Sequence, residues 1–121
     1  MKYILLIYHD EKRWHEIGEG ERQQMYAEYG RLREHLTSAG QYLGGSQLQL
    51  TTTASSIRIR DGKDLVTDGP FAETHEQLGG YFLVDVKNAA EAIAIAKQIP
   101  SARTGTIEVR ALVERAAEAN A

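Results

Sequence analysis

The chain has 121 residues, of which 42% are hydrophobic and 26% charged, the composition of one ordinary globular domain. A chain of this length buries about two-thirds of its surface on folding. The absence of cysteine excludes disulfides, thiolate metal sites and a cysteine nucleophile. A net charge of −3 argues against nucleic acid as a partner. The apolar run at residues 3–8 is too short for a signal peptide or a membrane span, so we expect a cytoplasmic protein without membrane contact.

The first half of the chain predicts a strand followed by a helix. Residues 2–8 are apolar at both odd and even positions, which is typical of a central strand that is covered on both faces. A polar loop is expected from His9 to about Gly20. From Glu21 apolar residues recur at spacings of three and four, which predicts a helix that ends at Gly40. Its expected apolar stripe consists of Met25, Tyr29, Leu32, Leu36 and Ala39.

The middle of the chain predicts a second strand and a small β-hairpin. Residues 42–50 form a looser strand, interrupted by two glycines at 44–45, and residues 51–55 form a polar connector. Residues 57–60 and 65–67 flank the tight-turn pair Asp61-Gly62, the pattern of a hairpin. Arg58 and Arg60 are expected on its outer face. An ordered loop or a single turn is expected over residues 71–78.

The last third predicts a strand, a helix and a final strand. Residues 80–86 form the second strand that is apolar on both faces. Asn88, with Glu91 three residues later, predicts a capped helix that Pro100 stops. Residues 107–113 form the final strand, and residues 114–121 are expected to fray. The buried stripe of the helix is expected to be Ala89, Ala92, Ile93, Ala96 and Ile99.

This order of elements predicts an α+β fold of the ferredoxin-like βαββαβ type with a β-hairpin insertion, in a single domain over residues 1–113. Two helices cover one face of the sheet. The strands at 2–8 and 80–86 are apolar on the other face as well, and no third helix is predicted to cover it. The sheet of a second copy of the chain would cover this second apolar face most simply, so we expect a homodimer.

The segment VTDGPFAETHEQLGGY, residues 66–81, resembles the signature of the DGPF-domain branch of the YCII-related family. The segments KYILLIY, AGQYLGGSQLQ, RIRDGKDLVTDGPF and IPSARTGTIEVR also resemble it, so the resemblance spans residues 1 to about 113. It implies a dimeric α/β barrel that associates through its sheets and, in some members, a link to extracytoplasmic-function sigma factors. A His–Asp pair near the first helix suggests catalysis in the broader family. Here that helix offers Tyr29 and His35 with no obvious Asp partner, so the pair is not carried over.

The DGPF motif, Asp68-Gly69-Pro70-Phe71, has two interpretations. As architecture, Asp68 caps a turn and Phe71 plugs the core. As a site, Asp68 is a carboxylate at a pocket rim that Glu73 and His75 join as an acid–base group. The predicted ligand-binding residues are then Asp68, Gly69, Pro70, Phe71, Glu73 and Arg58, the arginine holding an anionic ligand or the partner chain.

His9 and Asp10 directly follow the first central strand, a position from which side chains often line a cleft. His15 lies in the same segment, but its spacing from His9 matches no recognised metal site, so no metal is expected. The glycines at positions 18, 20, 44 and 45 lack the context of a dinucleotide or phosphate loop, so no cofactor is expected.

Two hypotheses of function follow. In the first, a homodimer binds or converts a small molecule in a pocket near the DGPF motif through Asp68 and either His9 or His75. In the second, the protein is a non-catalytic interaction module, for example an accessory to a sigma factor. A concave pocket that contains Asp68 favours the first, and a flat exposed patch favours the second.

Overall fold

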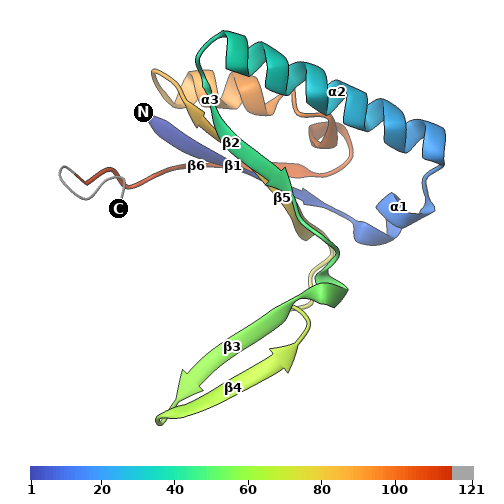
Figure 1. Ribbon diagram of the computed structural model, residues 1–121, viewed down its shortest axis with the longest axis vertical. Coiled ribbons are helices and arrows are strands. Elements are labelled where there is room, and N and C mark those ends of the chain that lie inside the picture. The colour runs from blue at the N-terminus through green and yellow to red at the C-terminus, as the bar shows by residue number, and fades with distance from the viewer. Residues whose placement is uncertain (116–121) are drawn as a thin grey trace.

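Helices pack on one face of an antiparallel sheet, and a long hairpin projects away from this body (Figure 1). The computed structural model describes residues 1–115. In chain order the elements are β1 (Lys2–His9), α1 (Glu11–Glu16), α2 (Glu19–Ser38), β2 (Tyr42–Gln47), the 3₁₀ turn η1 (Thr51–Thr53), β3 (Ser55–Arg60), β4 (Lys63–Asp68), β5 (Gln77–Asp85), α3 (Ala89–Ala96), the 3₁₀ turn η2 (Pro100–Arg103) and β6 (Thr106–Ala111). Within this part of the chain no helix is long and apolar enough to cross a membrane.

The four-stranded sheet has the order β2-β5-β1-β6, and every neighbouring pair is antiparallel. This order fits a ferredoxin-like βαββαβ chain, with β3 and β4 forming a separate two-stranded sheet. The predicted α+β class with a hairpin insertion is therefore confirmed. The dimeric barrel stays a prediction.

The core lies between the sheet and the two longer helices. On β1 and β5 every second side chain is buried, because successive residues of a strand point to opposite faces. These side chains meet apolar residues of α2, of α3 and of the segment between α3 and η2, so a single core holds the helices on the sheet. Its members include Tyr3, Leu5, Ile7, Leu32, Leu36, Phe82, Val84, Ala92, Ile95 and Ile99.

The loop predicted from His9 to Gly20 is wrong, because this segment contains α1. The side chain of Asp10 caps this helix by accepting a hydrogen bond from the Lys12 N–H at 2.9 Å. The six-residue helix contains no buried residue, so it has no apolar period that the sequence could reveal.

The predicted ends of α2 and α3 are largely confirmed, and their buried stripes are corrected at three positions. Gly40 has φ +73°, and the next amide, Gln41 N–H, donates to Leu36 O at 2.9 Å, which is a Schellman cap. Asn88 caps α3 through the Glu91 N–H at 3.0 Å. Ala39, Ala89 and Ile93 are exposed rather than buried, and Ile95 takes the place predicted for Ile93.

The predicted hairpin is confirmed as β3 and β4. Asp61 and Gly62 both have positive φ, +52° and +73°, as a two-residue turn of this hand requires. β3 and β4 contact each other far more than either of them contacts any other element, and the hairpin projects away from the body in Figure 1. Ile57, Ile59 and Val66 are each more than 60% exposed on it.

Replacing Gly62 by valine is expected to destabilise the hairpin by about 1 kcal/mol or more, because a β-branched residue is strained at positive φ. Since the hairpin packs mainly on itself, the effect is local. Amide hydrogen exchange over residues 55–68 should accelerate while that of β1 and β5 stays unchanged. Asp61→Asn is the matched control, because asparagine tolerates this conformation. Unchanged exchange in Gly62→Val would contradict the turn.

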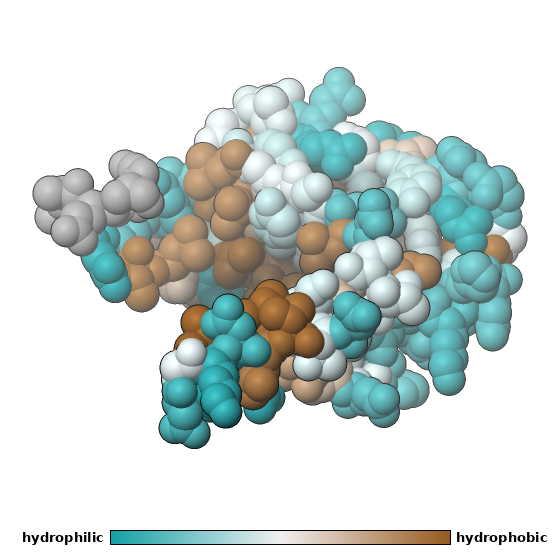
Figure 2. Space-filling view, turned by 60° about the horizontal axis from the view of Figure 1, so that its bottom comes forward, coloured by the Kyte–Doolittle hydropathy of each residue, from teal (hydrophilic) through white to brown (hydrophobic). Residues whose placement is uncertain are grey.

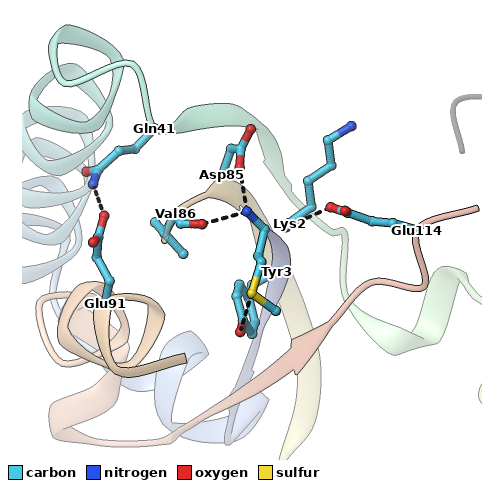
Figure 3. Close-up of polar contacts among 8 residues, drawn as sticks. Lys2, Tyr3, Gln41, Asp85, Val86, Glu91 and Glu114 are labelled. Carbon is cyan, nitrogen blue, oxygen red and sulfur yellow. Dashed lines mark hydrogen bonds and ion pairs between the residues drawn. The ribbon is translucent and has the colours of Figure 1, made fainter. Parts of the chain in front are cut away.

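Polar contacts hold together the end of the sheet at which the chain begins (Figure 3). The amino group of Met1 donates to Val86 O at 2.6 Å and lies 3.1 Å from the Asp85 carboxylate. The Lys2 N–H donates to the Glu114 carboxylate at 3.1 Å, so the chain remains in contact with the sheet just beyond β6. Of the tail predicted to fray, residues 116–121 lie outside the described residues.

Within residues 1–115 no element covers the face of the sheet opposite the helices, here called the open face. Ile4, Leu6 and Tyr8 on β1, with Tyr81 and Leu83 on β5, are only partly buried there. The register places Ile4 opposite Leu83 and Leu6 opposite Tyr81, so these side chains form one apolar surface. Figure 2 shows apolar surface both on the body and on the hairpin that projects toward the viewer.

Candidate functional site

A pocket lies under α2, at the end of β1 where the central strand reaches His9. Its volume is about 230 Å³, which suits a small organic molecule. Apolar and aromatic side chains form most of its wall, with a few polar groups among them. The lining residues are Ile7, His9, Trp14, Tyr26, Tyr29, Arg33, Ser46, Gln47, Gly79, Gly80, Phe82 and Ser101.

The position of His9 depends on an irregularity in β5. Ile7 pairs with Gly80 but Tyr8 pairs with Leu78, so Gly79 is an extra residue in the strand, a β-bulge. A Cβ atom on Gly79 would lie 2.3 Å from Nε2 of His9. The imidazole therefore lies across the bulge in space that only glycine leaves open.

His9 is half-buried, and burial lowers the pKa of its imidazole below the ordinary value. The carboxylates of Glu11, Asp10 and Glu76 act in the opposite direction without outweighing the burial. The imidazole is accordingly neutral at pH 7, and one of its ring nitrogens can accept a proton.

Trp14 forms an aromatic wall of the pocket. Its ring centroid lies 5.9 Å from that of His9 and 5.7 Å from that of Tyr26, in an edge-on arrangement with the tyrosine. The guanidinium of Arg22 stands over the indole at 5.3 Å and donates to Trp14 O at 2.9 Å. These contacts bind α1 to α2 and hold the indole beside His9.

The start of α1 is fastened to the base of the hairpin. The carboxylate of Glu11 accepts from both N and Oγ1 of Thr51, each at 2.8 Å. The Glu11 N–H donates to Oε1 of Gln77 at 3.0 Å. α1 is thus held by η1 and β5 at its start and by Arg22 at its end, so it is a fixed part of the pocket wall.

The floor of the pocket contains a pair of hydroxyl groups. Oη of Tyr29 and Oγ of Ser101 are 2.6 Å apart, and the Tyr29 ring packs edge-on against Phe82 at 6.0 Å. Burial raises the pKa of the Tyr29 hydroxyl, which therefore stays protonated at neutral pH. Tyr29, predicted on the apolar stripe of α2, packs against the core and also lines the pocket.

The structure places the DGPF motif away from this pocket, at the end of β4. Phe71 is 81% exposed, so the prediction that it plugs the core is wrong. The Asp68 side chain makes no hydrogen bond within residues 1–115, so it does not cap the turn. The turn is instead set by Gly69, whose φ is +94° and whose N–H donates to Ala54 O at 2.7 Å. Ser56 Oγ adds a hydrogen bond to Gly69 O at 2.8 Å.

The other residues predicted around this motif are also exposed. Among the described residues no hydrogen bond or ion pair joins Asp68, Glu73 and His75, and Arg58 lies on the hairpin. None of them, nor Gly69 or Pro70, lines the pocket. Of the candidate residues, His9 alone is brought into it, and roles for the others stay predictions.

Sequence reasoning missed Trp14, Arg33 and Ser101 as pocket residues. A signal for the first was present, since Trp14 is the one tryptophan of the chain. Arg33 lies four residues after Tyr29 and seven after Tyr26, a spacing that places all three on one side of α2. Ser101 carried no signal, because only the fold brings η2 under α2.

Fold and pocket together define the class: a small α+β protein with a four-stranded antiparallel sheet and a pocket between that sheet and its longest helix. The chain belongs to the YCII-related family, since the family model described as the YCII-related domain matches residues 1–116. It is similar to the uncharacterized protein R00369 of Rhizobium meliloti (strain 1021), with 34% identity over 114 residues. That match covers 93% of this chain and 92% of the relative.

Proposed function

We propose that this YCII-related protein binds a small molecule in the pocket under α2, where His9 accepts a proton from it. The observation that carries the proposal is the neutral, half-buried imidazole that the bulge at Gly79 seats in the pocket wall. A general base must be unprotonated at working pH and within reach of the bound molecule. His9 meets the first condition through burial and the second through its place among the lining residues.

The surroundings of His9 suit proton transfer. The aromatic side chains of Trp14, Tyr26 and Phe82 give the bound molecule an apolar environment. There the hydrogen bonds and charges act more strongly than in water. The hydroxyl pair of Tyr29 and Ser101 offers a donor for an oxygen on which negative charge develops. Proton abstraction from a bound small molecule is the reaction that this set of groups supports.

A thermal-shift screen of small metabolites tests the proposal, because a ligand that binds the folded state raises the apparent melting temperature. A ligand that raises the melting temperature of the wild type is expected to raise that of His9→Gln less or not at all. Where the ligand is a substrate, the variant is expected to lose its turnover, since the amide cannot take up a proton. Asp68→Asn is the matched comparison and should bind as the wild type does. The reverse result, binding lost in Asp68→Asn and kept in His9→Gln, would move the site to the DGPF motif.

We also propose that two copies associate through the open face of the sheet. The half-buried side chains of Ile4, Leu6 and Leu83 support this, because an exposed apolar sheet face usually marks an interface. The sigma-factor association implied by the resemblance and the cytoplasmic location stay predictions. A non-catalytic interaction module is the outcome to accept if no small molecule binds the pocket.

A further inference from the structure

We propose that the pocket takes a small organic carboxylate with a planar body, whose charge is bound by Arg33. The inference rests on the proposed function, because it names the ligand class of the same pocket. The inference gives Arg33 a defined role: Arg33 would set the specificity of the pocket for anions, while His9 accepts the proton of the bound molecule.

The charge of the pocket lining favours an anion. Of the twelve lining residues one is an arginine and none is aspartate or glutamate. The imidazole of His9 is neutral, so Arg33 is the single full charge that the described residues place on the wall. The carboxylates near His9, those of Asp10, Glu11 and Glu76, are not part of this lining. A ligand with one negative charge would leave the occupied pocket electrically neutral.

Arg33 is free to bind such a charge. In residues 1–115 its guanidinium has no carboxylate partner, whereas Arg22 lies 2.9 Å from Glu19 and Arg103 lies 2.8 Å from Glu28. Arg33 lines the pocket and is also exposed, so its guanidinium is accessible to a carboxylate from solvent. The planar fork of a guanidinium matches the two oxygens of a carboxylate.

The remaining wall accommodates the body of the ligand. Trp14, Tyr26 and Phe82 present aromatic rings, and Ile7 adds an aliphatic side chain. Planar molecules gain offset-stacked and edge-on contacts with such rings. A single guanidinium neutralises one charge, which favours a carboxylate over the doubly charged phosphate of a monoester. The volume of about 230 Å³ admits a molecule of roughly the size of an aromatic acid.

The probes for a test are benzoate and benzamide, which share shape and differ in charge. Each is titrated into the protein labelled with ¹⁵N at pH 7.5, with the indole N–H of Trp14 as reporter. Benzoate is expected to shift this resonance, and its affinity from the titration should be about tenfold or more above that of benzamide. High salt should reduce this difference in affinity, because it screens the charge of Arg33. In Arg33→Gln the two probes should bind alike. Arg31→Gln, an exposed arginine on the same helix outside the pocket, should keep the difference.

The possible results separate the two proposals. Benzamide binding as tightly as benzoate, or an unchanged preference in Arg33→Gln, would overturn the carboxylate inference and leave the pocket as a site for neutral ligands. A Trp14 resonance that neither probe moves would overturn the inference as well. Together with a thermal-shift screen that yields no ligand, that result would also overturn the proposed function.

Discussion

Replacing Gly79 by alanine is expected to abolish ligand binding in the pocket and to lower the free energy of unfolding by about 1 kcal/mol, the low end of the cost of overpacking, because the added Cβ meets only the end of the half-buried His9 side chain. The added Cβ would lie 2.3 Å from Nε2 and 2.6 Å from Cδ2 of His9. Both distances are far below van der Waals contact, so the imidazole must leave its place. Because Trp14 packs against that ring at 5.9 Å, the aromatic wall is expected to shift with it.

Gly44→Ala is the matched control for this substitution. Gly44 lies in β2 of the same sheet, and a Cβ atom there would meet nothing within 4 Å. Its free energy of unfolding should change by no more than about 0.5 kcal/mol, and the ligands of the wild type should still bind. Thermal denaturation and the ligand screen measure both effects. Ligand binding that survives in Gly79→Ala would contradict the role of the bulge.

Much of the fold was readable from local patterns. The continuous apolar runs in β1 and β5 predict that both strands are central, because a strand with apolar residues on both faces favours burial of both faces. Asp61 and Gly62 predict a turn that the positive φ angles confirm, and Asn88 predicts the cap of α3. These features depend on residues that are neighbours in sequence or one helical turn apart, so a single chain reveals them.

The pocket depends on contacts that no local pattern reveals. His9, Trp14, Tyr29, Gly79 and Ser101 come from β1, α1, α2, β5 and η2, and only the register of the sheet and the docking of α1 bring them together. The glycine that seats His9 lies 70 positions away from it in the chain, within the same segment as the DGPF motif. The DGPF motif is conspicuous in the sequence because aspartate, glycine and proline are turn formers.

The apolar residues on the open face favour association of two copies of the chain. The same alternation that buries Tyr3, Leu5 and Ile7 under the helices leaves Ile4 and Leu6 on the other side. Apolar residues on a solvent-facing surface contribute little to the stability of one chain, whereas a second copy of the face removes them from water. A stable interface of this kind buries about 1,200–2,000 Å² in total. The apolar face is therefore the strongest argument for a homodimer.

Replacing Leu6 by lysine is expected to weaken the dimer by about 100-fold or more, because a two-fold interface would take two ammonium groups out of water into an apolar surface. The separate chain should tolerate the change, since residue 6 lies directly opposite Glu108 in β6 and an opposite charge there is favourable. Ile93→Lys is the matched control, because Ile93 is 45% exposed on α3, away from the open face. Sedimentation velocity at micromolar concentration should show a dimer for the wild type and for Ile93→Lys and a monomer for Leu6→Lys. A wild type that sediments as a monomer, or a Leu6→Lys variant that stays dimeric, would mean that the open face does not join two copies.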